Sequence, residues 1–216
     1  HHQDGQSPIL ASTVPSVRTY DPAFAWELAV LVRFGIQRMF VEDHDELFYL
    51  MMYNEALPMP ARPDNDNLDE GVVRGGYLLE PAAGDGSRVN LLGSGTILFE
   101  VMQAAAILRE GGYPVAFFRI TSYVELARDA GRAEQGGAAG DPARLDTIFP
   151  ETDVPTVAAT DYVRALPRMI ASWMNGPFTV LGTDGFGMSE RRSDLRAHFK
   201  VDGASIADAA RKLTAS

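Results

Sequence analysis

The segment LGTDGFGMS, residues 181–189, is the stretch of the chain that says most about its fold. It continues a short apolar run at 179–181 and adds three glycines and an aspartate directly after it. Glycine readily adopts positive φ angles, so this composition predicts a tight turn at the carboxyl end of a strand, where α/β proteins usually place their sites. We expect Ser189 to cap the helix that follows; a purely structural turn is the alternative interpretation.

Strands and helices alternate along the chain before and after this turn. We expect strands at 76–80, 89–92, 115–120, 156–159 and 179–181, and helices at 96–109, 124–128, 162–174, 189–198 and 205–213. A loop rich in glycine and alanine separates two of them at 131–142. This alternation predicts an α/β fold with a mostly parallel sheet flanked by helices.

The first 60 residues show a second, shorter α/β pattern. Residues 1–20 are expected to form a loop and a short strand, followed by a helix at 23–40. Asp21 is predicted to cap this helix, and Pro22 suits its first position. The continuous apolar run at 47–52 has the length and composition of a buried parallel strand.

A change of composition separates these two patterns. Three prolines at positions 58, 60 and 63 lead into the polar run 64–70, which is too hydrophilic to join a core. We therefore predict a linker at 61–70 between a first domain at 1–60 and a second at 71–216. An ordinary long surface loop is the alternative.

Charge and composition exclude several classes of function. The chain has 216 residues, a formal net charge of −10 and a pI near 4.8, so nucleic acid and anionic membrane surfaces would repel it. Cysteine is absent, which excludes disulfides and thiol catalysis and suits a cytoplasmic location. The sequence has no signal peptide pattern and begins without methionine, so we expect a piece of a longer protein.

Motifs for common cofactors and metals are incomplete. The turn at 93–95 lacks the third glycine of a dinucleotide fingerprint, since position 98 is Leu98, and is predicted to be a plain tight turn. The acidic run 64–70 resembles a calcium loop, but Leu68 and Gly75 stand where that loop needs oxygen ligands. The four histidines show no zinc-ligand spacing. We therefore expect no metal-binding or cofactor-binding residues in this chain.

Several segments together resemble one enzyme family. Residues 181–189, their continuation LRAHFKVD at 195–202, and the segments 160–162, 121–129, 91–98 and 20–25 occur in the same order in the homodimeric pyruvate dehydrogenase decarboxylating component of the transketolase superfamily. The resemblance covers nearly the whole chain. It implies that residues 1–60 are the end of a pyrimidine-binding middle domain, and that 71–216 are a transketolase C-terminal-like domain.

The resemblance also implies an activity, cofactors and partners for the full-length parent. The parent would decarboxylate pyruvate with thiamine diphosphate and Mg²⁺, and transfer the acetyl group to a dihydrolipoyl acetyltransferase core. It would act as a homodimer. The resemblance places the metal-binding Gly-Asp-Gly motif and the activating glutamate of the family upstream of the segments matched here, so we expect the chain alone to bind no cofactor and to be inactive.

His2 is the single catalytic candidate that the resemblance suggests. Alignment of Thr13-Val14-Pro15 with the family's Thr-Ile-Pro places His2 on a histidine that lines the thiamine pocket. A histidine with a pKa near neutrality can donate and accept protons during decarboxylation. The alternative is a tag remnant or a frayed terminus. The sequence departs from the family at Gln6 and Pro8, where histidines are common, and in the loop after Asp129, which lacks the usual tryptophan.

Two other functions remain open at this point. The chain could be a non-catalytic interaction module that keeps the family fold, or belong to a thiamine enzyme for another 2-oxo acid or a ketose phosphate. A sugar phosphate would need a clamp of cationic side chains, and the region around His2 has none.

Overall fold

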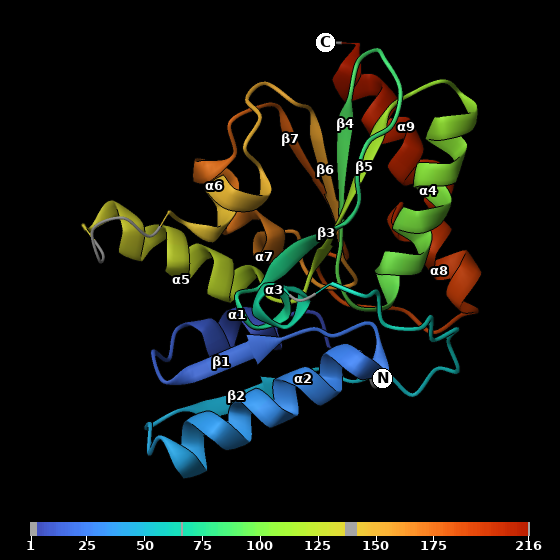
Figure 1. The fold of residues 1–216 in the computed structure, drawn as a ribbon. Helices are drawn as coiled ribbons and strands as arrows, with labels where there is room; N and C mark the ends of the chain where they lie inside the picture. Colours follow the sequence, from blue (N-terminus) through green and yellow to red (C-terminus); the bar gives the residue numbers. More distant parts are fainter. Residues whose placement is uncertain (1–3, 66, 137–141, 216) are drawn as a thin grey trace.

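A five-stranded sheet organises the C-terminal two thirds of the chain (Figure 1). The computed structural model describes residues 4–65, 67–136 and 142–215. The strands are β3 (Gly76–Glu80), β4 (Val89–Gly93), β5 (Val115–Ile120), β6 (Thr156–Ala159) and β7 (Phe178–Leu181). Their order is β3-β5-β4-β6-β7; β3 is antiparallel to β5 and the other pairs are parallel. The predicted mostly parallel α/β sheet is confirmed.

Helices cover both faces of this sheet, as Figure 1 shows. On one face lie α4 (Leu98–Glu110), which continues a 3₁₀ turn at Gly95–Ile97, and α9 (Gly203–Thr214). On the other lie α5 (Tyr123–Glu134), α6 (Arg144–Ile148) and α7 (Ala165–Arg168). Neighbouring strand residues alternate between the two cores: Leu91 belongs to the first and Leu92 to the second, and neither is exposed. Burial on both faces explains why the side chains of these strands are mostly apolar.

The N-terminal region forms a smaller layer, drawn below the large sheet in Figure 1. It contains α1 (Ser7–Ser12), β1 (Val17–Tyr20), α2 (Ala25–Ile36), a π-helical turn at Gln37–Val41, and β2 (Leu47–Leu50). β1 and β2 pair in parallel, and α2 packs against them. No helix in the described part of the chain is long and apolar enough to cross a membrane.

The prediction that residues 47–52 form a buried strand is wrong in one respect. The strand is parallel, as expected, but it is an edge strand of a two-stranded sheet. Leu47 and Tyr49 are exposed, whereas Phe48 and Leu50 pack toward α2. An apolar run gives strand length but cannot tell which of its faces is covered.

The predicted helix at 162–174 is also wrong. The structure has only α7 and a 3₁₀ turn at Ala171–Trp173. Pro167 explains why the helix does not start at 162, because a proline inside that helix would remove a backbone donor and clash with the preceding turn, whereas in α7 it lies in the first turn. Asp21 does not cap α2 either: the N-cap is Phe24, and the Glu27 carboxylate accepts from the backbone N–H groups of Ala23 and Phe24.

Three stretches predicted as irregular contain helix. α1 lies within residues 1–20, where proline at the start favours helix. α5 continues to Glu134, into the stretch expected as a loop at 131–142. The last residues of the stretch predicted as a linker, 61–70, belong to α3 (Leu68–Val73), and Leu68 is buried against the N-terminal layer. The domain limits themselves remain a prediction.

A buried ion pair joins the N-terminal layer to the large sheet. Arg119 on β5 and Glu27 on α2 are both fully buried, with 2.9 Å between Arg119 Nε and Glu27 Oε1. The guanidinium also donates to the carbonyl oxygens of Gly93 and Asp21, and Tyr77 donates to Glu27. Each polar atom of the pair is therefore engaged, as a buried charge requires.

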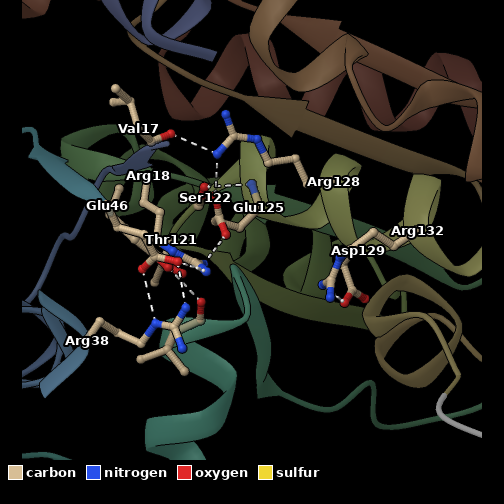
Figure 2. Close-up of polar contacts among 12 residues, drawn as sticks. Val17, Arg18, Arg38, Glu46, Thr121, Ser122, Glu125, Arg128, Asp129 and Arg132 are labelled. Carbon is tan, nitrogen blue, oxygen red and sulfur yellow. Dashed lines mark hydrogen bonds and ion pairs between the residues drawn. The ribbon is translucent and has the colours of Figure 1, made fainter. Parts of the chain in front are cut away.

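A second, less buried network lies at the edge of the same junction (Figure 2). Arg18 on β1 bridges Glu46 and Glu125, with N···O distances of 2.9 and 2.6 Å. Arg38 adds a second pair to Glu46, and Arg128 on α5 pairs with Glu125 and donates to Val17 O. Hydrogen bonds from Arg38, followed by those from Arg18, lower the pKa of Glu46 from 4.5 to about 2.

We predict that Arg119→Met destabilises the chain by about 3–5 kcal/mol, because it leaves the Glu27 carboxylate buried without a cation. Urea unfolding followed by circular dichroism measures this loss. The control is Arg132→Met, whose side chain is 74% exposed and should change stability by less than about 0.5 kcal/mol. Equal effects of the two substitutions would contradict the role given to Arg119.

Glu46→Gln should lower stability by about 2 kcal/mol near neutral pH, since it removes charge-assisted hydrogen bonds. The folded-state pKa of Glu46 lies below its ordinary value, so its contribution is complete above about pH 4.5 and is lost as the pH falls toward 2. Measuring the free energy of unfolding of the wild type and of Glu46→Gln between pH 3 and 7 tests this. The control is Glu42→Gln, whose side chain is more exposed. If the difference in stability between the wild type and Glu46→Gln did not become smaller at acidic pH, the lowered pKa of Glu46 would be refuted.

Candidate functional site

A cleft of about 470 Å³ opens at the carboxyl ends of β4, β6 and β7. Its walls come from both parts of the chain: Asp4, Tyr53 and Glu55 from the N-terminal region, and Thr96, Asp161 and α8 (Arg192–Phe199) from the C-terminal region. Both this edge of an open parallel sheet and the junction of two layers are positions where α/β proteins bind ligands. The cleft is therefore the candidate functional site.

Asp161 supplies a shielded carboxylate to the cleft. It follows β6, and its Oδ2 accepts a hydrogen bond of 2.7 Å from Thr96 Oγ1. Burial raises the pKa of Asp161, while the bond from Thr96 opposes that rise. A carboxylate in this position can accept hydrogen bonds from a cationic or hydroxylated group.

Two arginines of α8 form the opposite wall. Arg192 pairs with Glu55 at 2.5 Å, and Arg196 lies 3.7 Å from the same carboxylate. Arg196 also pairs with Glu100 of α4 at 3.0 Å, and Glu100 accepts from the backbone N–H of Gly203. Arg196 thus ties α8, α4 and the segment after β2 together across the cleft.

The glycine-rich turn 182–189 forms the rim. Gly185 has a φ of +79°, which fits the predicted tight turn. Arg164 holds Asp184 through its backbone N–H (2.9 Å) and its side chain, and Gln6 Nε2 donates to Gly185 O at 3.0 Å. The prediction that Ser189 caps the next helix is wrong, since α8 starts at Arg192 with Arg191 as N-cap.

The glycine turn after β4 has a packing role. A Cβ atom on Gly95 would lie 2.3 Å from Tyr53 Oη and 2.6 Å from Asp21 Oδ1, so no larger residue fits. The Gly95 N–H donates to Asp21 O at 3.3 Å and is thus already used. This agrees with the prediction of a tight turn in place of a phosphate-binding loop.

His2, the predicted catalytic residue, lies outside the described residues. Its neighbours are placed: Asp4 lines the cleft, and Gly5 O accepts from Val163 N at 3.0 Å. Sequence reasoning missed Asp161, Arg196 and Glu55. The first two lie in segments recognised by family resemblance, but nothing in their spacing shows that the fold brings them to one cleft.

We predict that Arg196→Gln destabilises the chain by about 1.5–3 kcal/mol, because it breaks charge-assisted bonds in a side chain only 16% exposed. Arg192→Gln is the matched control on the same helix; its side chain is 52% exposed, and its loss should stay below about 1 kcal/mol. Chemical unfolding compares the two. Similar losses of stability in the two variants would show that Arg196 is not the main side chain that joins α8 to the rest of the structure.

Comparison with known families matches both parts of the chain. Residues 75–202 match the transketolase-like TK C-terminal domain, and residues 1–60 match the pyruvate dehydrogenase E1 component middle domain. The first match covers more than half of the chain.

Curated relatives match across the whole chain. It is 40% identical over 213 residues to the pyruvate dehydrogenase E1 component of Corynebacterium glutamicum, covering 95% of this chain and 23% of that protein. It is 38% identical over 215 residues to the pyruvate dehydrogenase E1 component of Escherichia coli K12, which covers 97% of this chain and 24% of that protein. The chain thus spans about a quarter of the length of these relatives.

Solved structures share the fold at low sequence identity. Transketolase from Leishmania mexicana superimposes with a TM-score of 0.71 at 17% identity, covering 99% of this chain and 28% of that one. A structure described as a split gene transketolase, inactive beta4 tetramer, superimposes with a TM-score of 0.70 at 14% identity. The match covers 99% of this chain and 63% of that one. With the two family matches, these findings show that the chain belongs to the transketolase-like C-terminal domain family and continues from a pyruvate dehydrogenase E1 middle-domain segment.

Proposed function

We propose that this chain acts as part of a pyruvate dehydrogenase E1 component. The observation that carries the proposal is a match over 213 residues at 40% identity, which covers 95% of the chain and therefore spans both the N-terminal and the C-terminal region. In this proposal the complete protein decarboxylates pyruvate with thiamine diphosphate and Mg²⁺, and passes the acetyl group to a dihydrolipoyl acetyltransferase core. It does so in the cytoplasm.

The described residues do not by themselves fit a diphosphate and its metal ion. The cleft carries the carboxylates of Asp4, Glu55, Asp161 and Glu190 and only two arginines, both already close to Glu55. Among the described residues, no group of three potential metal ligands lies together. We therefore propose that other polypeptide of the complete protein holds the cofactor, and that this chain supplies His2 and a supporting wall.

Self-association also belongs to this proposal. The outer surface of α2 forms an apolar groove of about 530 Å³, and Val32 and Ile36 in it are 44% and 51% exposed. Apolar side chains that remain exposed in this way are typical of surfaces that are covered in an assembly. This supports the proposed homodimer.

A non-catalytic interaction module is the second candidate. A chain of the same fold occurs in an assembly described as inactive, which shows that transketolase-like chains can assemble in that condition. The two candidates differ in whether the chain sustains turnover once it is joined to the remaining three quarters of a relative.

A chimera tests the proposal. We expect the Corynebacterium glutamicum relative, with its matching segment replaced by this chain, to decarboxylate pyruvate in the presence of thiamine diphosphate. His2→Ala in the chimera should lower kcat about 100-fold or more, as removal of a general acid or base does, with little change in stability. His44→Ala is the control, since its half-exposed side chain contacts Glu42 outside the cleft.

Calorimetric titration separates failure of folding from failure of function. We expect the chimera to bind thiamine diphosphate with Mg²⁺, and the 216-residue chain alone to show no binding heat. A chimera that folds and binds cofactor but does not turn over pyruvate would favour the interaction module. Unchanged turnover in His2→Ala would remove His2 from the catalytic residues.

A further inference from the structure

A very small cavity lies where β1, β4 and β5 end near one another. Thr19, Asp21, Ser94 and Tyr123 are among the residues that line it, so both parts of the chain contribute. It leaves about 10 Å³ for the centre of a water-sized sphere, which is the room that one water molecule needs. The lining is rich in hydroxyl groups and contains one carboxylate.

Two residues that line this cavity each have a buried polar atom without a hydrogen-bond partner among the described residues. Asp21 is 4% exposed; its Oδ1 accepts from Tyr53 Oη at 2.8 Å, but its Oδ2 has no partner. Tyr123 is 2% exposed, and its hydroxyl has no partner either. Buried polar groups are almost always satisfied by protein or by ordered water. A single water can donate to the carboxylate and accept from the phenol.

Asp21 also holds the two parts of the chain together through its backbone. Its N–H donates to Thr121 O at 2.8 Å, and its carbonyl oxygen accepts from Arg119 Nη2 at 2.6 Å and from Gly95 N–H at 3.3 Å. Any change at the Asp21 side chain therefore acts directly on the junction between β1 and the large sheet.

The charged and titratable groups around Asp21 come from every neighbouring element. They are Arg119 on β5, Glu27 on α2, Tyr53 after β2, Tyr123 on α5, and Asp161 and Tyr162 after β6. Burial raises the pKa of Asp21 to about 6, although Arg119, the bond from Tyr53 and the neighbouring Ser94 hydroxyl oppose that rise. Since Glu27 already balances Arg119, an ionised Asp21 is a second buried negative charge at this junction.

We propose that this cavity binds one internal water molecule between Asp21 Oδ2 and Tyr123 Oη, and that proton uptake by Asp21 at this site controls the strength of the junction. With Asp21 ionised, Tyr53 and the water donate to its carboxylate, and the Ser94 hydroxyl beside it also supports the charge. When Asp21 takes up a proton, the second negative charge disappears and the carboxyl group can donate to the water.

The sign of the pH effect follows from the raised pKa. The folded chain holds the Asp21 proton more tightly than the unfolded chain, so this group favours folding most below about pH 4 and progressively less up to about pH 6. Asp21→Asn cannot ionise. The folding equilibrium constant of Asp21→Asn relative to wild type should therefore rise by on the order of 100-fold between pH 4 and pH 7.

Unfolding of the 216-residue chain in urea at several pH values tests the proton step, and a carbon NMR titration of the Asp21 carboxyl group measures its midpoint directly. The control is Asp85→Asn, at an exposed aspartate outside this cavity, whose substitution should leave the Asp21 midpoint unchanged. A midpoint for Asp21 near 4, or a constant difference between Asp21→Asn and wild type, would overturn the proton step.

Tyr123→Phe tests the water. Loss of the hydroxyl should weaken the hold on the water and shift the Asp21 midpoint upward, because the ionised carboxylate loses support. Tyr113→Phe, on a half-buried tyrosine outside this cavity, should leave the midpoint unchanged. An Asp21 midpoint that does not move in Tyr123→Phe would overturn the water bridge even if the proton step holds.

Discussion

The contact between Glu27 and Arg119 is the constraint on which the arrangement of this chain depends. This fully buried ion pair joins α2 to the central sheet. Glu27 also accepts from the backbone N–H of Ala23 in the N-terminal layer, and Arg119 donates to the carbonyl oxygens of Gly93 and Asp21, one in each region. Two charges taken out of water gain little net stability over a well-packed apolar pair. What the pair provides is a fixed relative position, because these backbone bonds hold Glu27 to the N-terminal layer and Arg119 to both regions.

That position determines the cleft. Tyr53 and Glu55 follow β2, whereas Thr96, Asp161 and Arg196 belong to the C-terminal region, so the two walls face one another only if the two regions keep their register. The hydrogen bond from Arg196 to Glu100, its looser ion pair with Glu55, and the outer network around Arg18 reinforce the same register from either side. The proposed E1 function needs this rigidity, since a wall that moved would misplace groups that the rest of the protein supplies.

The sequence was sufficient for what depends on local pattern and on family resemblance. The five strands of the large sheet and the turn after β7 follow from apolar runs and glycines, and residues 181–202 indicated the family. It was not sufficient where partners distant in the chain decide. The two helix errors have a local origin, since Glu27 and not Asp21 caps α2 and Pro167 interrupts the helix expected at 162–174. Asp161, by contrast, meets Thr96 across 65 positions. The periodicity of a sequence does not predict such long-range contacts. It also does not predict which face of β2 is exposed.

Native-state hydrogen exchange tests the central claim most directly, namely that the N-terminal layer and the large sheet unfold as one unit. Leu31 in α2 and Leu92 in β4 are both fully buried and report on the two regions. The account predicts that their amides exchange through the same global opening, with equal free energies and equal denaturant dependence. Exchange of the Leu31 amide through a separate opening of lower free energy, with Leu92 still protected, would contradict it.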